Sequence, residues 1–90
     1  MVAPFRRRTE EVLDAIRLVL APYVGSLMAR SAVVAHCRDL GIAGDLISRE
    51  QLDALLERLG LGLVIFVGRE KTAEVVAAMK RAVEALPEVS

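Results

Sequence analysis

The sequence predicts an all-α single domain with four helices in a bundle-like or orthogonal arrangement around a central apolar helix at residues 23–40. Two observations lead to this prediction. The chain has 90 residues, which is the size of one domain with a single core. Apolar residues recur at helical spacing in four segments that proline or glycine separates from one another. The expected helices lie near residues 10–20, 23–40, 49–66 and 69–86.

Residues 1–8 are predicted to be a flexible basic arm, and residues 9–90 to be the helical domain. Three consecutive arginines, Arg6–Arg8, repel one another and favour a solvated chain. Thr9 can cap the first helix. Pro22 is predicted to end that helix, because the residue before a proline is disfavoured in the helical region.

The helix at 23–40 is predicted to be buried on several sides. No charge occurs between Arg17 and Arg30, and a helical wheel of this segment has no clean polar face. A helix that is apolar nearly all round is normally covered by neighbours. We therefore place Leu27 and Val34 in the core.

The third helix has the clearest start signal in the chain. Ser48 and Gln51 form the pattern of a capping box, and leucines follow at helical spacing. The stretch Leu63–Val67 also has β propensity, and a strand that pairs across a dimer stays open as the alternative. Helix is favoured, because Leu63 and Phe66 continue the leucine stripe. Gly68 should then break the chain before the last helix.

The apolar content predicts self-association. Hydrophobic residues make up 54% of the chain, and the mean hydropathy is +0.45. A small domain has too much surface for its volume to hide all of them. The candidate interaction residues are those that point away from the leucine stripe or follow it, and we expect a homodimer. They are Leu61, Val64, Ile65 and Val67.

Charge, hydropathy and cysteine content argue against nucleic acid and membranes as partners and favour a cytoplasmic location. Twelve basic and twelve acidic residues give a net charge of zero, so neither nucleic acid nor a membrane surface is an expected partner. The uncharged run Leu18–Ala29 is shorter than the ~20 residues that cross a bilayer. A single cysteine and the lack of a secretory pattern at the start favour a cytoplasmic protein.

No catalytic, cofactor-binding or metal-binding residue is predicted, and we do not expect an enzyme. His36 and Cys37 are adjacent, so on a helix they point about 100° apart and cannot readily share one metal or form a nucleophile–base pair. Packing roles are expected for both. The alternative function is a small hydrophobic-ligand or haem-binding helical domain that uses the apolar interior and His36.

Two motifs in the sequence are typical of a known family. The first consists of Tyr23, Val24, Gly25, Ala29, Cys37, Leu40, Gly41 and Ile42, and the second of Phe66, Val67, Gly68, Glu70, Lys71 and Ala73. With these motifs the chain resembles a small helical module that accompanies kinase, receiver and roadblock-type regulators in bacterial and archaeal signalling proteins. The resemblance covers the chain from about Leu13 to Leu86. It implies a helical fold and a non-catalytic protein–protein interaction or oligomerisation role in intracellular signalling.

Overall fold

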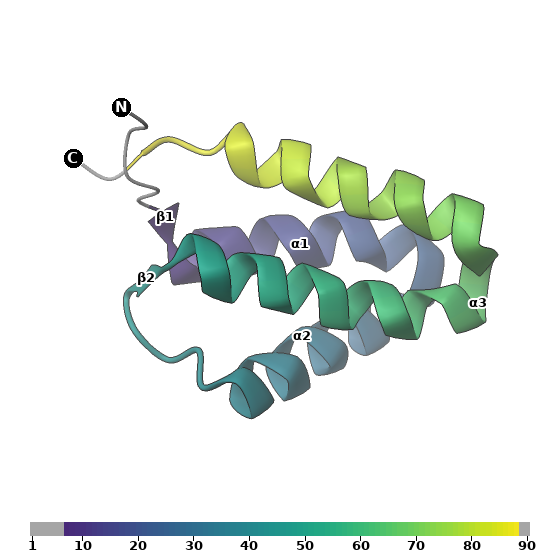
Figure 1. The fold of residues 1–90 in the computed structure, drawn as a ribbon, viewed down its shortest axis with the longest axis horizontal. Helices are drawn as coiled ribbons and strands as arrows, with labels where there is room; N and C mark the ends of the chain where they lie inside the picture. The colour runs from purple at the N-terminus through teal and green to yellow at the C-terminus, as the bar shows by residue number, and fades with distance from the viewer. Residues whose placement is uncertain (1–6, 89–90) are drawn as a thin grey trace.

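The computed structural model describes residues 7–88, and this part of the chain is almost entirely helical, which confirms the all-α prediction (Figure 1). Two strands of two residues each lie beside the helix starts. In chain order the elements are β1 (Arg7–Arg8), α1 (Thr9–Val24), α2 (Ser26–Leu40), β2 (Leu46–Ile47) and α3 (Arg49–Glu84).

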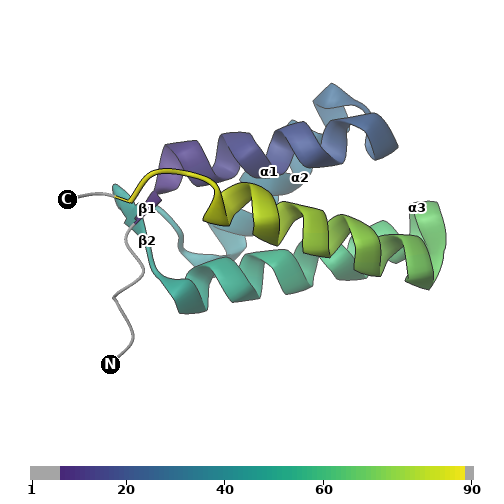
Figure 2. The ribbon, with the colours of Figure 1, turned by 90° about the horizontal axis from the view of Figure 1, so that it is seen from above.

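The chain consists of two similar halves, each with a short strand, a helix, one non-helical glycine and a returning helix. α1 and the first part of α3 run the same way, and α2 and the second part of α3 run back (Figures 1 and 2). Gly25 (φ 89°, ψ 152°) and Gly68 (φ 81°, ψ 171°) make the two reversals. Only glycine adopts this backbone region readily, which explains why a single residue suffices at each joint.

The residues described contain three helices, so the prediction of four is wrong. The expected third and fourth helices form one element, α3, which is kinked at Gly68. Gly68 is the residue of α3 that lies outside helical geometry. Leu63–Val67 is helical. The favoured interpretation of this stretch is therefore correct, and the strand alternative is not.

The predicted central helix is not central. α2 buries only a narrow stripe, made of Ala29, Val33 and Cys37. Leu27 is 79% exposed and Val34 is also exposed, although both were expected in the core. α2 packs against α1 and the first part of α3 on one side only (Figure 1). Its larger apolar residues Leu27, Met28 and Val34 are therefore exposed.

The core lies between α1 and the two parts of α3, with the narrow stripe of α2 closing one side. A buried glycine, Gly60, brings the two parts of α3 together, since a Cβ there would already lie 3.4 Å from Cγ2 of Val76. The buried apolar side chains come from both halves of the chain. They include Val12, Ile16 and Leu20 of α1, and Leu52, Leu55, Leu56, Leu59, Leu63, Val75, Met79 and Val83 of α3.

Two expectations about the first helix are also corrected. Thr9 is the first residue of α1 and does not cap it, because Arg8 is the N-cap residue and no side chain bonds the helix start. Pro22 lies inside α1, and the helix continues to Val24. The proline lacks an N–H and so removes one helical bond near the end of the helix, but the amide of Gly25 still donates to the carbonyl of Ala21 at 2.8 Å. The chain turns at Gly25 because only that residue adopts the conformation of the joint.

Part of the predicted arm is ordered structure. Residues 1–6 lie outside the described residues, but Arg7 and Arg8 form β1, which pairs antiparallel with β2. Arg7 is buried, and its guanidinium lies 3.3 Å from the carboxylate of Glu88. This ion pair offsets part of the cost of removing the guanidinium from water. The all-α prediction therefore did not include the small sheet that these two strands form.

The predicted start of the third helix is confirmed. The hydroxyl of Ser48 accepts a hydrogen bond from the amide of Gln51 at 3.1 Å, and the side chain of Gln51 accepts one from the amide of Ser48 at 3.0 Å. This capping box satisfies two amides that a helix end would otherwise leave without partners.

Candidate functional site

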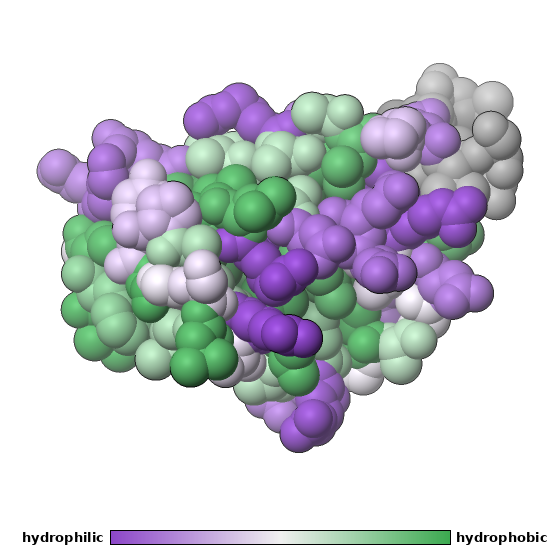
Figure 3. Space-filling view, turned by 180° about the vertical axis from the view of Figure 1, so that it is seen from behind, coloured by the Kyte–Doolittle hydropathy of each residue, from purple (hydrophilic) through white to green (hydrophobic). Residues whose placement is uncertain are grey.

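Large apolar side chains gather at the end of the molecule where α1 joins α2 and α3 bends. On α3, Ile65 is 85% exposed, Leu61 68% and Phe66 59%. On α2, Leu27 and Met28 are exposed as well. Figure 3 shows apolar side chains gathered at this end of the molecule, on the left of the view. We call these five residues the apolar end.

Two uncharged stretches of sequence meet at this end. Residues 18–29 contain the joint between α1 and α2, and residues 59–68 contain the approach to the bend of α3. The joints at Gly25 and Gly68 lie at the same end of the molecule (Figure 1). The fold therefore concentrates uncharged surface in one place, although the two stretches are far apart in the sequence.

The structure distributes the four predicted interaction residues unequally. Leu61 and Ile65 are well exposed, Val64 is half-buried, and Val67 packs partly against the core. Phe66 was expected on the buried leucine stripe, but it is largely exposed because the stripe ends at Leu63. Sequence reasoning also missed the exposed residues of α2. The absence of charge between Arg17 and Arg30 was the available signal, but it was interpreted as burial.

A shallow apolar groove separates α2 from the first part of α3, and we call it the α2–α3 groove. Its volume is about 80 Å³. Nδ1 of His36 is buried here and has no hydrogen-bond partner among residues 7–88. The groove is lined by Leu20 and Val24 of α1, Met28, Ala32 and His36 of α2, and Leu59, Gly62, Leu63 and Phe66 of α3.

In the other half of the molecule, the position that corresponds to this groove lies between α1 and the second part of α3, and it is filled by side chains. Lys71, Val75 and Met79 follow Gly68 at the intervals at which Met28, Ala32 and His36 follow Gly25. Val75 and Met79 are fully buried. Nζ of Lys71 lies 5.8 Å from the centre of the Tyr23 ring, and Tyr23 corresponds to Phe66. The same architecture is therefore closed on one side and open on the other.

One ion pair lies beside this closed side. Nζ of Lys71 lies 3.2 Å from the carboxylate of Glu74. The hydrogen bond between them raises the pKa of Lys71. No comparable charge is found among the residues that line the α2–α3 groove.

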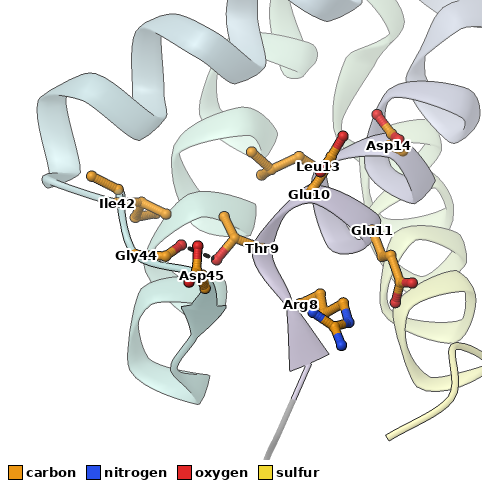
Figure 4. Close-up of a pocket in the computed structure, with 10 residues that line it drawn as sticks. Arg8, Thr9, Glu10, Glu11, Leu13, Asp14, Ile42, Gly44 and Asp45 are labelled. Atoms are coloured by element: carbon orange, nitrogen blue, oxygen red, sulfur yellow. Dashed lines mark hydrogen bonds between the residues drawn. The ribbon is translucent and has the colours of Figure 1, made fainter. Parts of the chain in front are cut away.

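A hollow of about 620 Å³ lies between the start of α1 and the loop before β2 (Figure 4). The hydroxyl of Thr9 donates to the carbonyl of Gly44 at 2.7 Å and ties this loop to the helix. Glu11 points away from Glu10 and Asp45 in Figure 4. The carboxylates therefore do not converge on a common ligand position.

Cys37 and His36 occupy different environments, as their adjacency on a helix predicts. Cys37 is buried in the core, and desolvation raises the pKa of its thiol. His36 lines the α2–α3 groove instead. Within residues 7–88, no group of three or more histidine, cysteine, aspartate or glutamate side chains is arranged to hold a metal ion.

No protein-family model matches this chain, and no curated protein or solved structure matches it either. In the described part of the chain, none of the helices has the length and apolar character needed to cross a membrane.

Proposed function

We propose that this chain is a non-catalytic protein–protein interaction or oligomerisation module, and that the apolar end is its binding surface. The observation that carries the proposal is the exposure of Leu61, Ile65 and Phe66 side by side on α3. Soluble monomers rarely expose large contiguous apolar patches, and such patches commonly mark interaction sites.

The energetics favour a covered apolar end. Fully burying a leucine, isoleucine, methionine or phenylalanine side chain stabilises by about 1.5–3 kcal/mol each. Five such side chains stand at this end, and each exposes about half or more of its surface. A partner that covered them would offset a substantial part of the cost of association.

The intracellular signalling setting rests on the resemblance described above. Its two motifs include Tyr23–Val24–Gly25 and Phe66–Val67–Gly68, and these triplets form the two joints that create the apolar end. A bacterial or archaeal regulator that assembles through this end, in the cytoplasm, is the setting that we propose.

The haem or small-ligand alternative has one supporting observation, the buried Nδ1 of His36 without a partner among the described residues. The volume of the groove argues against it. Ligand pockets typically enclose about 300–1,000 Å³, whereas this groove holds about 80 Å³, which is too little to enclose a haem. An absorbance band in the purified protein that is lost on His36→Ala would favour the alternative.

Photo-crosslinking in the native cell tests the proposed function. A photoreactive amino acid placed at Ile65 should form adducts with protein. The same amino acid at Glu84, an exposed position at the other end of the second part of α3, should form few. Adducts with this chain itself and with other proteins both support the proposal. Equal crosslinking at the two positions, or none at Ile65, would contradict it.

A further inference from the structure

We infer that the α2–α3 groove binds a second copy of this chain, with Ile65 and Phe66 of each copy seated against the groove of the other. This inference rests on the proposed function and names the partner. It draws on the open groove, on the ridge beside it, and on the area and charge of the apolar end.

The open groove is the first argument. In the other half of the molecule the equivalent positions carry Val75 and Met79, which fill the space, and Lys71, which covers an aromatic ring. In the α2–α3 groove Ala32 is much smaller than its counterpart Val75, and Phe66 remains exposed. Gly62 adds no side chain, and a Cβ built there would meet nothing within 4 Å. The groove therefore has room for side chains from outside.

The second argument is that the groove and a matching ridge lie on one surface. Ile65 and Phe66 project from α3 beside the groove, and Phe66 forms part of its wall. In a two-fold dimer the same patch meets itself, so the ridge of one copy faces the groove of the other twice. Gly62 and Ala32 are small and allow two helices to approach closely. A single surface thus supplies both halves of the contact.

Area and charge agree with a second copy. A stable interface buries about 800 Å² on each partner, and the five side chains of the apolar end, each about half or more exposed, are available to supply a large part of it. The groove is lined without charged residues, and the whole chain has a net charge of zero. Two copies therefore meet without the repulsion that a strongly charged chain would impose.

Sedimentation velocity with light scattering on the purified full chain tests the inference. The wild-type protein should show twice the monomer mass of 9.8 kDa at micromolar concentration and dissociate on dilution. Ile65→Glu should raise the dissociation constant at least roughly 30-fold, the effect of losing a central apolar contact. Circular dichroism should show unchanged helix content, because Ile65 is exposed.

The matched control is Leu18→Glu, which puts the same charge on an equally exposed apolar residue of α1 outside the groove. It should leave the dissociation constant within about threefold of wild type. If Leu18→Glu weakens the dimer as much as Ile65→Glu, the assignment of the surface is wrong. A wild-type monomer at all concentrations overturns the inference, and crosslinks from Ile65 to a different protein would still uphold the proposed function.

A cysteine pair tests the geometry independently of affinity. Two proteins are mixed, Ala32→Cys and Ile65→Cys, each in a chain that also carries Cys37→Ser. Mild oxidation should give the mixed disulfide-linked dimer, because in a two-fold arrangement the ridge of one copy lies against the groove of the other. In the control mixture, Leu18→Cys replaces Ile65→Cys as the partner of Ala32→Cys. If the control gives as much mixed disulfide-linked dimer as the test mixture does, the proposed contact is overturned.

Discussion

The ammonium of Lys71, in the second part of α3, lies 5.8 Å from the centre of the ring of Tyr23, near the end of α1. A cation over an aromatic face is attracted by the electrons of the ring. The equivalent aromatic residue, Phe66, has Met28 rather than a cation near it in the α2–α3 groove. This difference between the two halves of the molecule adds to the filling of the closed side by Val75 and Met79.

Tyr23 reports directly on that contact, because the chain has one tyrosine and no tryptophan. Lys71→Ala should uncover the ring and increase the quenching of tyrosine fluorescence by acrylamide. Lys80→Ala removes the other lysine, which lies elsewhere on the second part of α3, and should leave quenching unchanged. The same quenching in all three proteins would mean that Lys71 does not shield Tyr23.

The two joint glycines should resist substitution. Gly25→Ala and Gly68→Ala each force a side chain into a backbone region that is nearly exclusive to glycine, and we expect a loss of about 1–3 kcal/mol in the free energy of unfolding. Urea denaturation at fixed protein concentration measures it.

Gly62→Ala is the matched control for the joint glycines. Gly62 lies in α3 with no other atom close to the position of a Cβ. Below the concentration at which the chain self-associates, replacing this helical glycine by alanine should stabilise by roughly 0.5–1 kcal/mol. A joint variant as stable as wild type would show that the bends do not depend on these conformations.

Burial predicts a large loss of stability at one leucine and a small change at another. Leu55 is fully buried, so Leu55→Ala should lower the free energy of unfolding by about 2–5 kcal/mol. Leu27 is exposed on α2, so Leu27→Ala should change it by no more than about 0.5 kcal/mol when measured below the concentration at which the chain self-associates. Comparable losses at both positions would place α2 deeper in the fold than described above.

Cys37 should make stability depend on alkaline pH. Burial raises the pKa of the folded thiol above its ordinary value of 9.0, so the unfolded chain releases this proton at a lower pH than the folded chain does. The stabilising contribution is intact below that ordinary value and is lost as the pH rises through the folded pKa. The free energy of unfolding should therefore fall more steeply above about pH 9 in the wild type than in Cys37→Ala.

Thiol reactivity gives a second measurement at the same residue. A disulfide reagent should modify Cys37 slowly in the folded protein and rapidly in urea, because the thiolate is the reactive species and the folded thiol is buried. Equal alkaline slopes in the two proteins, together with fast labelling of the folded chain, would contradict a buried thiol.

The sequence by itself determined the local structure. Ser48 and Gln51 marked the start of α3, the leucine stripe predicted its buried face, and Gly68 marked the bend. These features depend on capping, helical periodicity and the conformational freedom of glycine, all of which operate within a few residues. The candidate residues Leu61 and Ile65 were also available from periodicity, because they lie opposite a well-defined stripe.

Only the tertiary structure decided which apolar residues are covered. The helical wheel of α2 has no clean polar face, so its periodicity does not distinguish the side that meets α1 and α3 from the side that carries Leu27. The sequence predicts a solvated arm at Arg7, whereas in the structure this residue pairs with β2 and forms an ion pair with Glu88. Burial depends on where other elements pack, and residues distant in the sequence supply those elements. For this reason the apolar end was recognisable only after the two joints were seen at one end of the molecule.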